Sequence, residues 1–178
     1  MYEKAREQNS ESVLQRALCS FECKKDLDIE SFLHNKAIPH IKRNTCSVYL
    51  ILDEGKFDEG EINIVAYFTL SARSVRFHEN ISKSKIKNIA GFKDRTSVPV
   101  VLIGQIGKHI SNKYTAKINL NEILSYAFEI ILAANELIPC RAVLVECSEI
   151  IHNHGIYEKA GFRFLQKDGD FYQYYRVI

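Results

Sequence analysis

The sequence predicts a mixed α/β (α+β) fold built on one central sheet of six to seven strands. The hydrophobic period changes from helical spacing near the start of the chain to the apolar runs of strands in its middle. A strand, a long helix and a second strand then follow one another between residues 98 and 147, which is the order of a right-handed crossover between parallel strands. With 178 residues, 46% of them hydrophobic, the chain is expected to form a single domain over residues 1–178.

Two short helices and two strands are expected in the first part of the chain. Apolar residues recur at helical spacing in residues 11–20 and again in residues 28–37. Residues 46–52 and 62–70 are rich in β-branched and aromatic residues, which indicates strands, and a turn is expected at residues 53–56 between them.

The middle of the chain predicts a strand followed by the clearest helix. Residues 82–96 are polar and lysine-rich, so we expect an irregular or partly helical connection there. A strand at residues 98–106 precedes a helix at 119–137, whose apolar positions form one stripe and which Pro139 is expected to end. Asn119 and Glu122 have the spacing of a reciprocal cap at the start of that helix.

The last part of the chain predicts a strand, a short helix and a hairpin. The strand at residues 141–147 should be the parallel neighbour of the strand at 98–106. Tyr157 lies on a short helix that stops at a glycine, and two aromatic strands around 162–165 and 171–175 follow it, separated by the turn Asp168-Gly169.

Composition narrows the class of protein. The net charge of +2 commits the chain neither to nucleic acid nor to an anionic membrane, although a local basic patch remains compatible with it. The five cysteines are odd in number, and Cys46 and Cys147 lie in apolar runs, which favours reduced thiols and a cytoplasmic location. No apolar run approaches the length of a membrane helix, and no signal peptide is expected.

The residues themselves leave two interpretations of Tyr157 open. A phenol placed at a strand edge can donate a proton to a leaving group, and an unperturbed phenol is protonated at neutral pH. The alternative is a core aromatic whose hydroxyl is satisfied by a neighbour, which is common where tyrosine is partly buried.

Four segments resemble the GNAT superfamily of acyl-CoA N-acyltransferases, and together they cover most of the chain. They correspond to the third strand of that family, its fourth strand, its pyrophosphate loop and its closing motif, the last being the most specific: Val65-Ala66-Tyr67-Phe68-Thr69-Leu70-Ser71, Val100-Val101-Leu102-Ile103-Gly104-Gln105-Ile106-Gly107-Lys108, Thr115-Ala116-Lys117-Ile118-Asn119-Leu120 and Ile156-Tyr157-Glu158-Lys159-Ala160-Gly161-Phe162.

The resemblance implies a GNAT fold with a splayed parallel pair of strands, helices on both faces of the sheet, and acetyl-CoA as co-substrate. It implies Tyr157 as the general acid toward the CoA thiolate and Asn153 beside the cofactor. Further cofactor contacts are implied for the pantetheine arm, at Gln105, Ile106, Gly107 and Lys108, and for the pyrophosphate, at Thr115, Ala116, Lys117, Ile118, Asn119 and Leu120.

The pyrophosphate loop departs from the family pattern, because no glycine occurs between Gly107 and Gly155. Backbone amides at a helix N-terminus can bind phosphate without glycine. The alternative is a non-catalytic binding module built on the same fold with a defective cofactor loop.

The general base is open on sequence grounds. Glu146 near the end of its strand is the first candidate, although a carboxylate at a strand end is often merely solvated. His109 and His152 are further candidates, and no metal site is expected around His152 and His154 because a third ligand is missing nearby.

The segment from Ser20 to Ala37 resembles the opening of a GNAT subgroup that includes toxins of toxin-antitoxin pairs, which acetylate the amino group of aminoacyl-tRNA; the matching positions are Phe21, Glu22, Cys23, Leu27, Phe32, Leu33 and Ala37. Such a substrate requires a basic face, for which residues 83–95 offer five positive side chains against Asp94 alone, and a solvated loop is the alternative for them. The acceptor amine stays open, as do an antitoxin partner and a homodimer through strand 171–175.

Overall fold

The computed structural model describes residues 11–24, 26–53, 62–110 and 118–178. The described strands form a six-stranded sheet in the order β1-β2-β3-β4-β6-β5. The chain divides into two compact units, Met1–Thr69 with Gln105–Ile123 and Leu70–Gly104 with Leu124–Ile178. The expected single domain over residues 1–178 stays a prediction.

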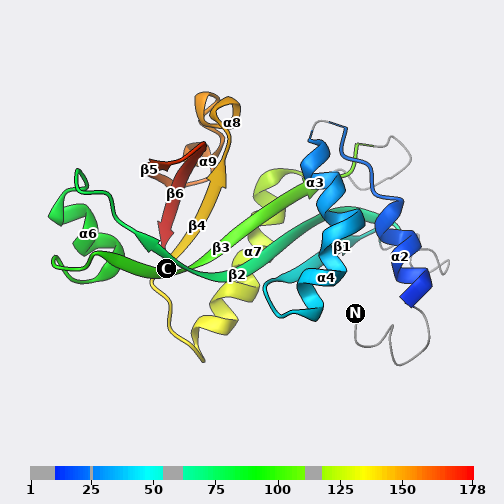
Figure 1. The fold of residues 1–178 in the computed structure, drawn as a ribbon, viewed down its shortest axis with the longest axis horizontal. Coiled ribbons are helices and arrows are strands. Elements are labelled where there is room, and N and C mark those ends of the chain that lie inside the picture. The colour runs from blue at the N-terminus through cyan, green and yellow to red at the C-terminus, as the bar shows by residue number, and fades with distance from the viewer. Residues whose placement is uncertain (1–10, 25, 54–61, 111–117) are drawn as a thin grey trace. The chain divides into compact units, whose positions relative to one another are not determined.

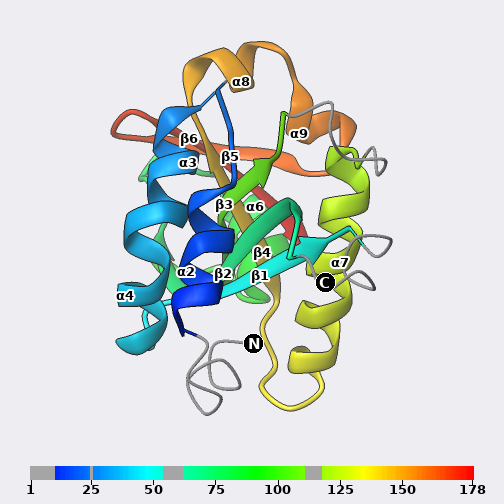
Figure 2. The same ribbon diagram turned by 90° about the vertical axis from the view of Figure 1, so that its right-hand side faces the viewer.

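The first unit begins with helices that cover their own apolar core. Helix α2 (Glu11–Cys19) is followed by one continuous helical run, α3 (Leu27–Ser31), the π-helix η1 (Phe32–Lys36) and α4 (Ala37–Lys42). Helix α2 packs on η1 and lies beside this run in Figure 2. The predicted second helix therefore extends five residues beyond residue 37. Pro39 is the third residue of α4 and lies within this run, directly after the π-helical segment η1, so the α-helical bonding is interrupted there without ending the helix.

Strand β1 (Ser47–Leu52) and the first half of β2 (Ile64–Arg76) complete the sheet of the first unit together with the end of β3 (Ser97–Lys108). The predicted turn after Leu52 lies outside the described residues apart from Asp53, which is buried. The core of this unit contains apolar side chains of α2, η1 and β2 around Phe21 and Tyr67, both fully buried and in edge contact at 5.3 Å between ring centroids.

The second unit contains the parallel pair that the sequence predicted. Strand β3 pairs in parallel with β4 (Ala142–Cys147), with Val101 opposite Val143 and Ile103 opposite Val145. Helix α7 (Leu120–Asn135) connects them along the chain. It ends at Asn135, earlier than predicted and well before Pro139, because the Asn135 side chain accepts a hydrogen bond from the Cys140 amide and turns the chain there.

The last two strands of the chain extend the sheet beyond β4. The hairpin of β5 (Arg163–Asp168) and β6 (Phe171–Val177) pairs through β6, antiparallel to β4 (Figure 1). Two short helices, α8 (Glu149–Asn153) and α9 (Ile156–Lys159), lie between β4 and β5 in the chain. The sequence predicted α9 and the hairpin, whereas α8 was not predicted.

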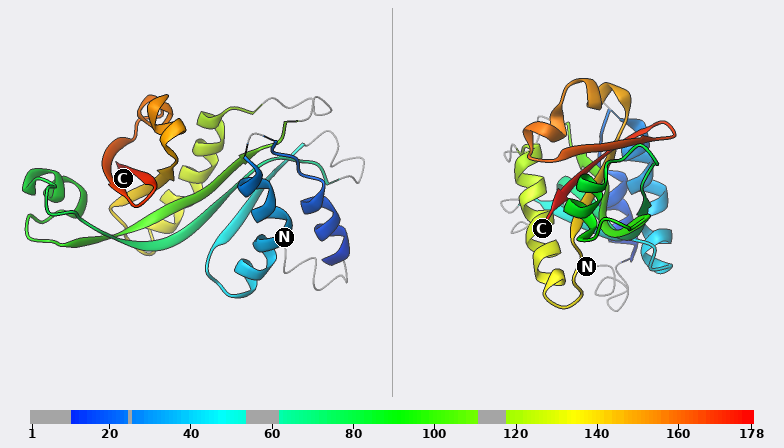
Figure 3. Two further views of the ribbon diagram at one scale, coloured as in Figure 1. Left: turned by 45° about the horizontal axis from the view of Figure 1, so that its top comes forward. Right: turned by 90° about the vertical axis from the view of Figure 1, so that its left-hand side faces the viewer.

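Helix α6 (Lys83–Ala90) occupies the connection between β2 and β3, drawn in green in Figure 3. Ser82 caps its start by accepting a hydrogen bond from the Lys85 amide, and Gly91 ends it in the left-handed region at φ 83°. The expected partly helical connection is therefore confirmed. Ile86 and Ile89 face the core of this unit, whereas Lys83 and Lys87 are exposed.

Candidate active site

Tyr157 lies on α9, a single helical turn bounded by two glycines in the left-handed region, Gly155 at φ 58° and Gly161 at φ 86°. A side chain with a Cβ adopts this backbone conformation only with strain, so the glycines allow the chain to enter and leave the turn sharply. The Tyr157 side chain is 8% exposed and packs against Phe162 and Tyr174, with ring centroids 5.8 and 5.9 Å away.

The Tyr157 hydroxyl forms no hydrogen bond with any described residue, and its oxygen is not completely buried. Burial raises the pKa of this phenol, and the nearby Cys147 thiol raises it further. Because the neutral form is favoured, the phenol keeps its proton at physiological pH. This environment suits a proton donor and differs from that of a core tyrosine with a satisfied hydroxyl.

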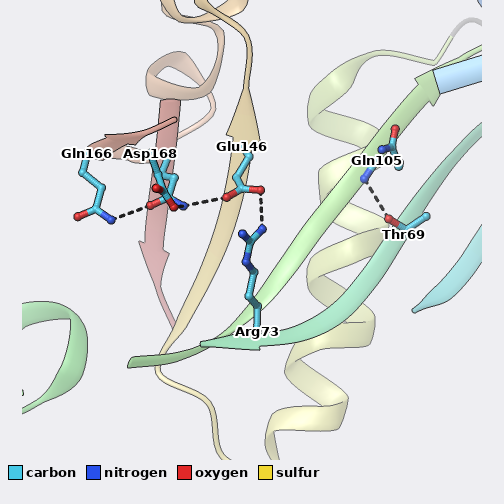
Figure 4. A network of polar contacts seen from close by, with 7 residues as sticks. Thr69, Arg73, Gln105, Glu146, Gln166 and Asp168 are labelled. Atoms are coloured by element: carbon cyan, nitrogen blue, oxygen red, sulfur yellow. Dashed lines mark hydrogen bonds and ion pairs between the residues drawn. The ribbon is translucent and has the colours of Figure 1, made fainter. Parts of the chain in front are cut away.

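Glu146 is the half-buried carboxylate of β4, and both of its oxygens accept hydrogen bonds (Figure 4). Arg73 Nη1 on β2 lies 2.7 Å from Oε2, and Gln173 Nε2 on β6 lies 2.8 Å from Oε1. The carboxylate is therefore fixed by neighbours from two strands and is not simply solvated. A carboxylate oxygen has room for more than one donor, so this arrangement remains compatible with accepting a proton.

The network around Glu146 continues to the hairpin edge. Gln173 accepts a hydrogen bond from Gln166 Nε2 at 2.9 Å (Figure 4). Gln166 also donates to the backbone carbonyl of Arg76 at 2.9 Å and accepts from the backbone amide of His78 at 3.0 Å. Sequence reasoning missed Arg73, Gln166 and Gln173. The available signal was the presence of polar residues inside otherwise apolar strands.

The predicted pantetheine-binding stretch lies at the end of β3 in the first unit. Within it, the backbone amide of Gln105 is not free for the cofactor, because it donates a hydrogen bond to Thr69 Oγ1 at 2.9 Å (Figure 4). Gln105 Oε1 is the buried side-chain oxygen that lacks a partner among the described residues. Gly107 packs so closely on Tyr67 and Ile29 that a Cβ there would collide with both. Ile106 is half-buried and Lys108 is exposed.

The predicted pyrophosphate loop is described only at its end, since Thr115, Ala116 and Lys117 lie outside the described residues. Ile118 is buried, and Leu120 opens α7. The expected reciprocal cap is confirmed: the Asn119 amide donates to Glu122 at 2.7 Å, and the Glu122 amide donates to Asn119 at 3.1 Å. A carboxylate therefore already lies at the helix N-terminus, where an anion would bind.

Asn153 ends α8 and is exposed. Its neighbour His152 bonds through Nδ1 to the Tyr174 hydroxyl at 2.6 Å and stacks on Tyr172 at 3.8 Å between ring centroids. His109 is buried in the first unit, where its ring nitrogen Nε2 lies 3.3 Å from the Ser20 carbonyl. In the part of the chain that the structure describes, no three histidine, cysteine or carboxylate side chains are grouped so as to hold a metal ion.

The basic segment between β2 and β3 is mostly exposed. Lys85 is the exception, because its ammonium binds the carbonyls of Phe164 and Leu165 at 3.0 and 3.5 Å and so fastens α6 to the hairpin. An exposed aromatic, Phe92, lies beside these cations with the Arg95 guanidinium 5.4 Å from its ring centroid. The remaining exposed cations of the segment are Lys83, Lys87, Lys93 and Arg95.

Most positions of the N-terminal motif lie in the buried core of the first unit. Phe21, Cys23, Phe32, Leu33 and Ala37 belong to its buried core, whereas Leu27 is exposed. Lys36, Lys42 and Arg43, which could extend a basic face, lie on the same unit and are exposed. No helix formed by the described residues has the length and apolar character needed to cross a membrane.

The sequence matches no protein-family model and no curated protein. Solved structures do resemble it. AtaT complexed with acetyl-methionyl-tRNAfMet superposes with a TM-score of 0.67 at 19% identity, covering 92% of this chain and 86% of that chain. The chain has the GNAT fold.

Two further structures have the same fold. A Tyr-to-Phe mutant of the AtaT toxin, bound to the C-terminus of the antitoxin AtaR and acetyl-CoA, has a TM-score of 0.65 at 14% identity and covers 90% of this chain and 85% of that chain. A Tyr-to-Phe mutant of KacT has a TM-score of 0.66 at 15% identity, with coverages of 90% and 86%. The predicted GNAT fold is thereby confirmed, and AtaT, one of the structures that share it, is named a toxin.

Proposed function

We propose that this protein is an acetyl-CoA-dependent N-acetyltransferase that transfers the acetyl group directly to a primary amine. The observation that carries this proposal is the state of Tyr157, a buried phenol that keeps its proton and donates to no described residue. The GNAT fold supports the co-substrate, because a neighbour of the same fold is bound to acetyl-CoA.

In the proposed reaction the acceptor nitrogen attacks the thioester carbonyl carbon, the carbon–sulfur bond breaks, and the amine loses one proton. Tyr157 donates its phenolic proton to the departing CoA thiolate, so the products are an amide and free CoA. Glu146, directly or through water, takes the proton from the amine. No covalent enzyme intermediate is needed, because binding both substrates supplies the proximity.

We propose that the acetyl-CoA contacts include backbone groups of residues 105–108 for the pantetheine, residues 115–120 for the pyrophosphate, and Asn153. The Gln105 amide is engaged with Thr69, so Ile106, Gly107 and Lys108 are the better candidates within the first stretch. The Glu122 carboxylate at the start of α7 opposes an anion, and a bound pyrophosphate would require that carboxylate to turn outward.

An aminoacyl-tRNA is the acceptor class that we propose. The exposed cations Lys83, Lys87, Lys93 and Arg95 beside the exposed ring of Phe92 support it, since phosphates bind cations and unpaired bases stack on aromatic rings. AtaT, a neighbour of the same fold, is bound to acetyl-methionyl-tRNAfMet. An antitoxin protein as binding partner and a cytoplasmic location follow from the same proposal, and a homodimer through β6 stays a prediction.

The test is the transfer of radiolabelled acetyl groups from acetyl-CoA to bulk aminoacyl-tRNA, with uncharged tRNA and free amino acids as controls. Label in the charged tRNA alone is the expected result. Label in another amine would correct the acceptor class, whereas no CoA release with any amine would overturn the proposed activity.

The second candidate, a binding module without catalysis, is favoured by the loop without glycine. Thermal unfolding separates the two, since acetyl-CoA at about 100 times its dissociation constant should stabilise a native binder by about 2.7 kcal/mol. No shift of the unfolding temperature at millimolar acetyl-CoA would favour the binding module.

A further inference from the structure

Three side chains of the second unit are joined by two short hydrogen bonds next to Tyr157. His152 Nδ1 on α8 lies 2.6 Å from the Tyr174 hydroxyl on β6, and that hydroxyl donates to Glu158 Oε1 on α9 at 2.7 Å. Tyr174 is fully buried, so its hydroxyl reaches only these partners through the protein. One phenol on a strand therefore ties two separate short helices to the sheet.

The direction of both bonds is fixed by the single proton of the Tyr174 hydroxyl. Because that proton goes to a carboxylate oxygen, which only accepts, the hydroxyl oxygen must accept from His152. His152 therefore carries a proton on Nδ1. The ring of His152 is further held by its stack on Tyr172, at 3.8 Å and 18° between the ring planes.

The turn that carries Tyr157 is held to the sheet by the packing of the Tyr157 ring on Phe162 and Tyr174 and by the bond of Glu158 to Tyr174. Helix α9 has four residues, and an isolated helix of that length is not stable in water. The left-handed glycines at both ends let the chain bend there, so they do not fix the direction of the turn. Glu158 is the immediate neighbour of Tyr157, and its bond to Tyr174 fastens this turn to β6.

We infer that Tyr174 is a positioning residue for Tyr157, acting through its hydrogen bond to Glu158 and its ring contact at 5.9 Å; the inference rests on the proposed acid role of Tyr157. Tyr174 acts on the reaction only indirectly: its hydroxyl donates to Glu158 on the turn and gives no proton to the substrate. A proton donor must lie within hydrogen-bond reach of the atom that it protonates, so a loosened turn lowers the rate of transfer.

The test uses Tyr174→Phe in the full chain, with Tyr172→Phe as the matched control on the same strand. The control removes a hydroxyl that donates to Glu149 at 3.3 Å and keeps the ring that stacks on His152. We expect Tyr174→Phe to lower kcat by about tenfold with an unchanged KM for acetyl-CoA, and the control to leave both near wild type.

Amide hydrogen exchange supplies a readout that does not depend on activity. The amides of Gly161 and Phe162 bond to carbonyls of α9 at 3.0 and 2.9 Å, so their exchange reports opening of this turn. We expect exchange there to be at least about tenfold faster in Tyr174→Phe than in the control. Equal exchange and equal kcat in the two variants would overturn the inference, as would faster exchange with an unchanged kcat.

Variants of Glu158 keep the test decisive if Tyr174→Phe does not fold. Glu158 is exposed, and Glu158→Gln retains an oxygen that can accept from Tyr174, whereas Glu158→Ala does not. We expect Glu158→Gln to keep most of the wild-type kcat and Glu158→Ala to lose most of it. Equal losses of kcat in the two variants would overturn the inference. Tyr157→Phe measured beside them separates the two claims, because unchanged turnover in that variant removes the acid role itself.

Discussion

The guanidinium of Arg73 on β2 binds the carboxylate of Glu146 on β4 at 2.7 Å, although the two residues are 73 positions apart in the sequence. The Glu146 side chain is 17% exposed and that of Arg73 is 44% exposed, so the pair lies at the border of the core. A half-buried carboxylate at this position requires a partner, and Arg73 supplies it. The ion pair therefore fixes the carboxylate that we propose as the base.

Replacing Arg73 by Met should destabilise the protein by about 1 kcal/mol, since a charged hydrogen bond is lost at a partly exposed site. Arg76→Met on the same strand is the matched control, because the guanidinium of Arg76 makes no ion pair with a described residue. Urea unfolding of both variants measures the difference. Equal free energies of unfolding would show that the ion pair contributes nothing to stability.

Gly107→Ala should destabilise the protein by about 1–3 kcal/mol, because the added Cβ would collide with the buried ring of Tyr67 and lie 2.7 Å from Ile29 Cγ2. Ser97→Ala at the exposed start of the same strand is the control. Thermal or urea unfolding tests the expectation. A wild-type free energy of unfolding for Gly107→Ala would mean that the strand has more room than the packing of Tyr67 indicates.

The cysteines should differ sharply in their reactivity toward a thiol reagent. Burial raises the pKa of Cys147 to about 11, with the charge of Glu158 adding to the shift, and burial also raises the pKa of Cys23. The reactive species is the thiolate. At pH 8 we expect Ellman's reagent to modify the exposed Cys19 quickly and Cys147 only as fast as the protein unfolds. Rapid modification of Cys147 in the folded protein would contradict this environment.

The raised pKa of Cys147 also predicts how stability depends on pH. The thiol keeps its proton in the folded protein above the ordinary value of 9.0, while the unfolded chain loses it. The stabilisation is therefore complete below pH 9 and is lost as the pH rises toward about 11. Cys147→Ala should show a smaller fall in unfolding free energy between these pH values than the wild type, and an equal fall would assign the effect to other groups.

Several features of the fold followed from local sequence patterns. The cap formed by Asn119 and Glu122 depends on neighbours in the chain and is present as predicted. The hairpin turn lies one residue later than predicted, at Gly169 and Asp170, since Asp168 still pairs with Phe171 as the last residue of β5. The parallel pairing of β3 and β4 followed from the handedness of the crossover, which restricts the possible topologies.

The partners of Glu146 could not be predicted in the same way. Arg73 belongs to a stretch of β2 where small and polar residues resemble a turn, so the strand was expected to end at residue 70. Its continuation to Arg76 is supported by pairing within the sheet and by the buried Val75, neither of which leaves a clear periodic signal. Long-range pairing, and not local propensity, decides such a segment.

The pH dependence of turnover should reflect the raised pKa of Tyr157. A phenol with an ordinary pKa near 10 would lose its donor proton as the pH approaches that value, and the rate would fall. Because burial favours the neutral form, we expect kcat to show no decline from loss of this proton up to pH 10. The measurement is the rate of CoA release corrected for uncatalysed thioester hydrolysis, and a decline centred well below pH 10 in folded protein would contradict it.

The acid role of Tyr157 is tested by kcat for CoA release by Tyr157→Phe, measured with saturating acetyl-CoA and bulk aminoacyl-tRNA. We expect a loss of about 10²–10⁴-fold, since one general acid is removed, with the acetyl-CoA-induced rise in unfolding temperature unchanged. A kcat equal to that of the wild type would contradict the role of Tyr157 as the acid that releases CoA.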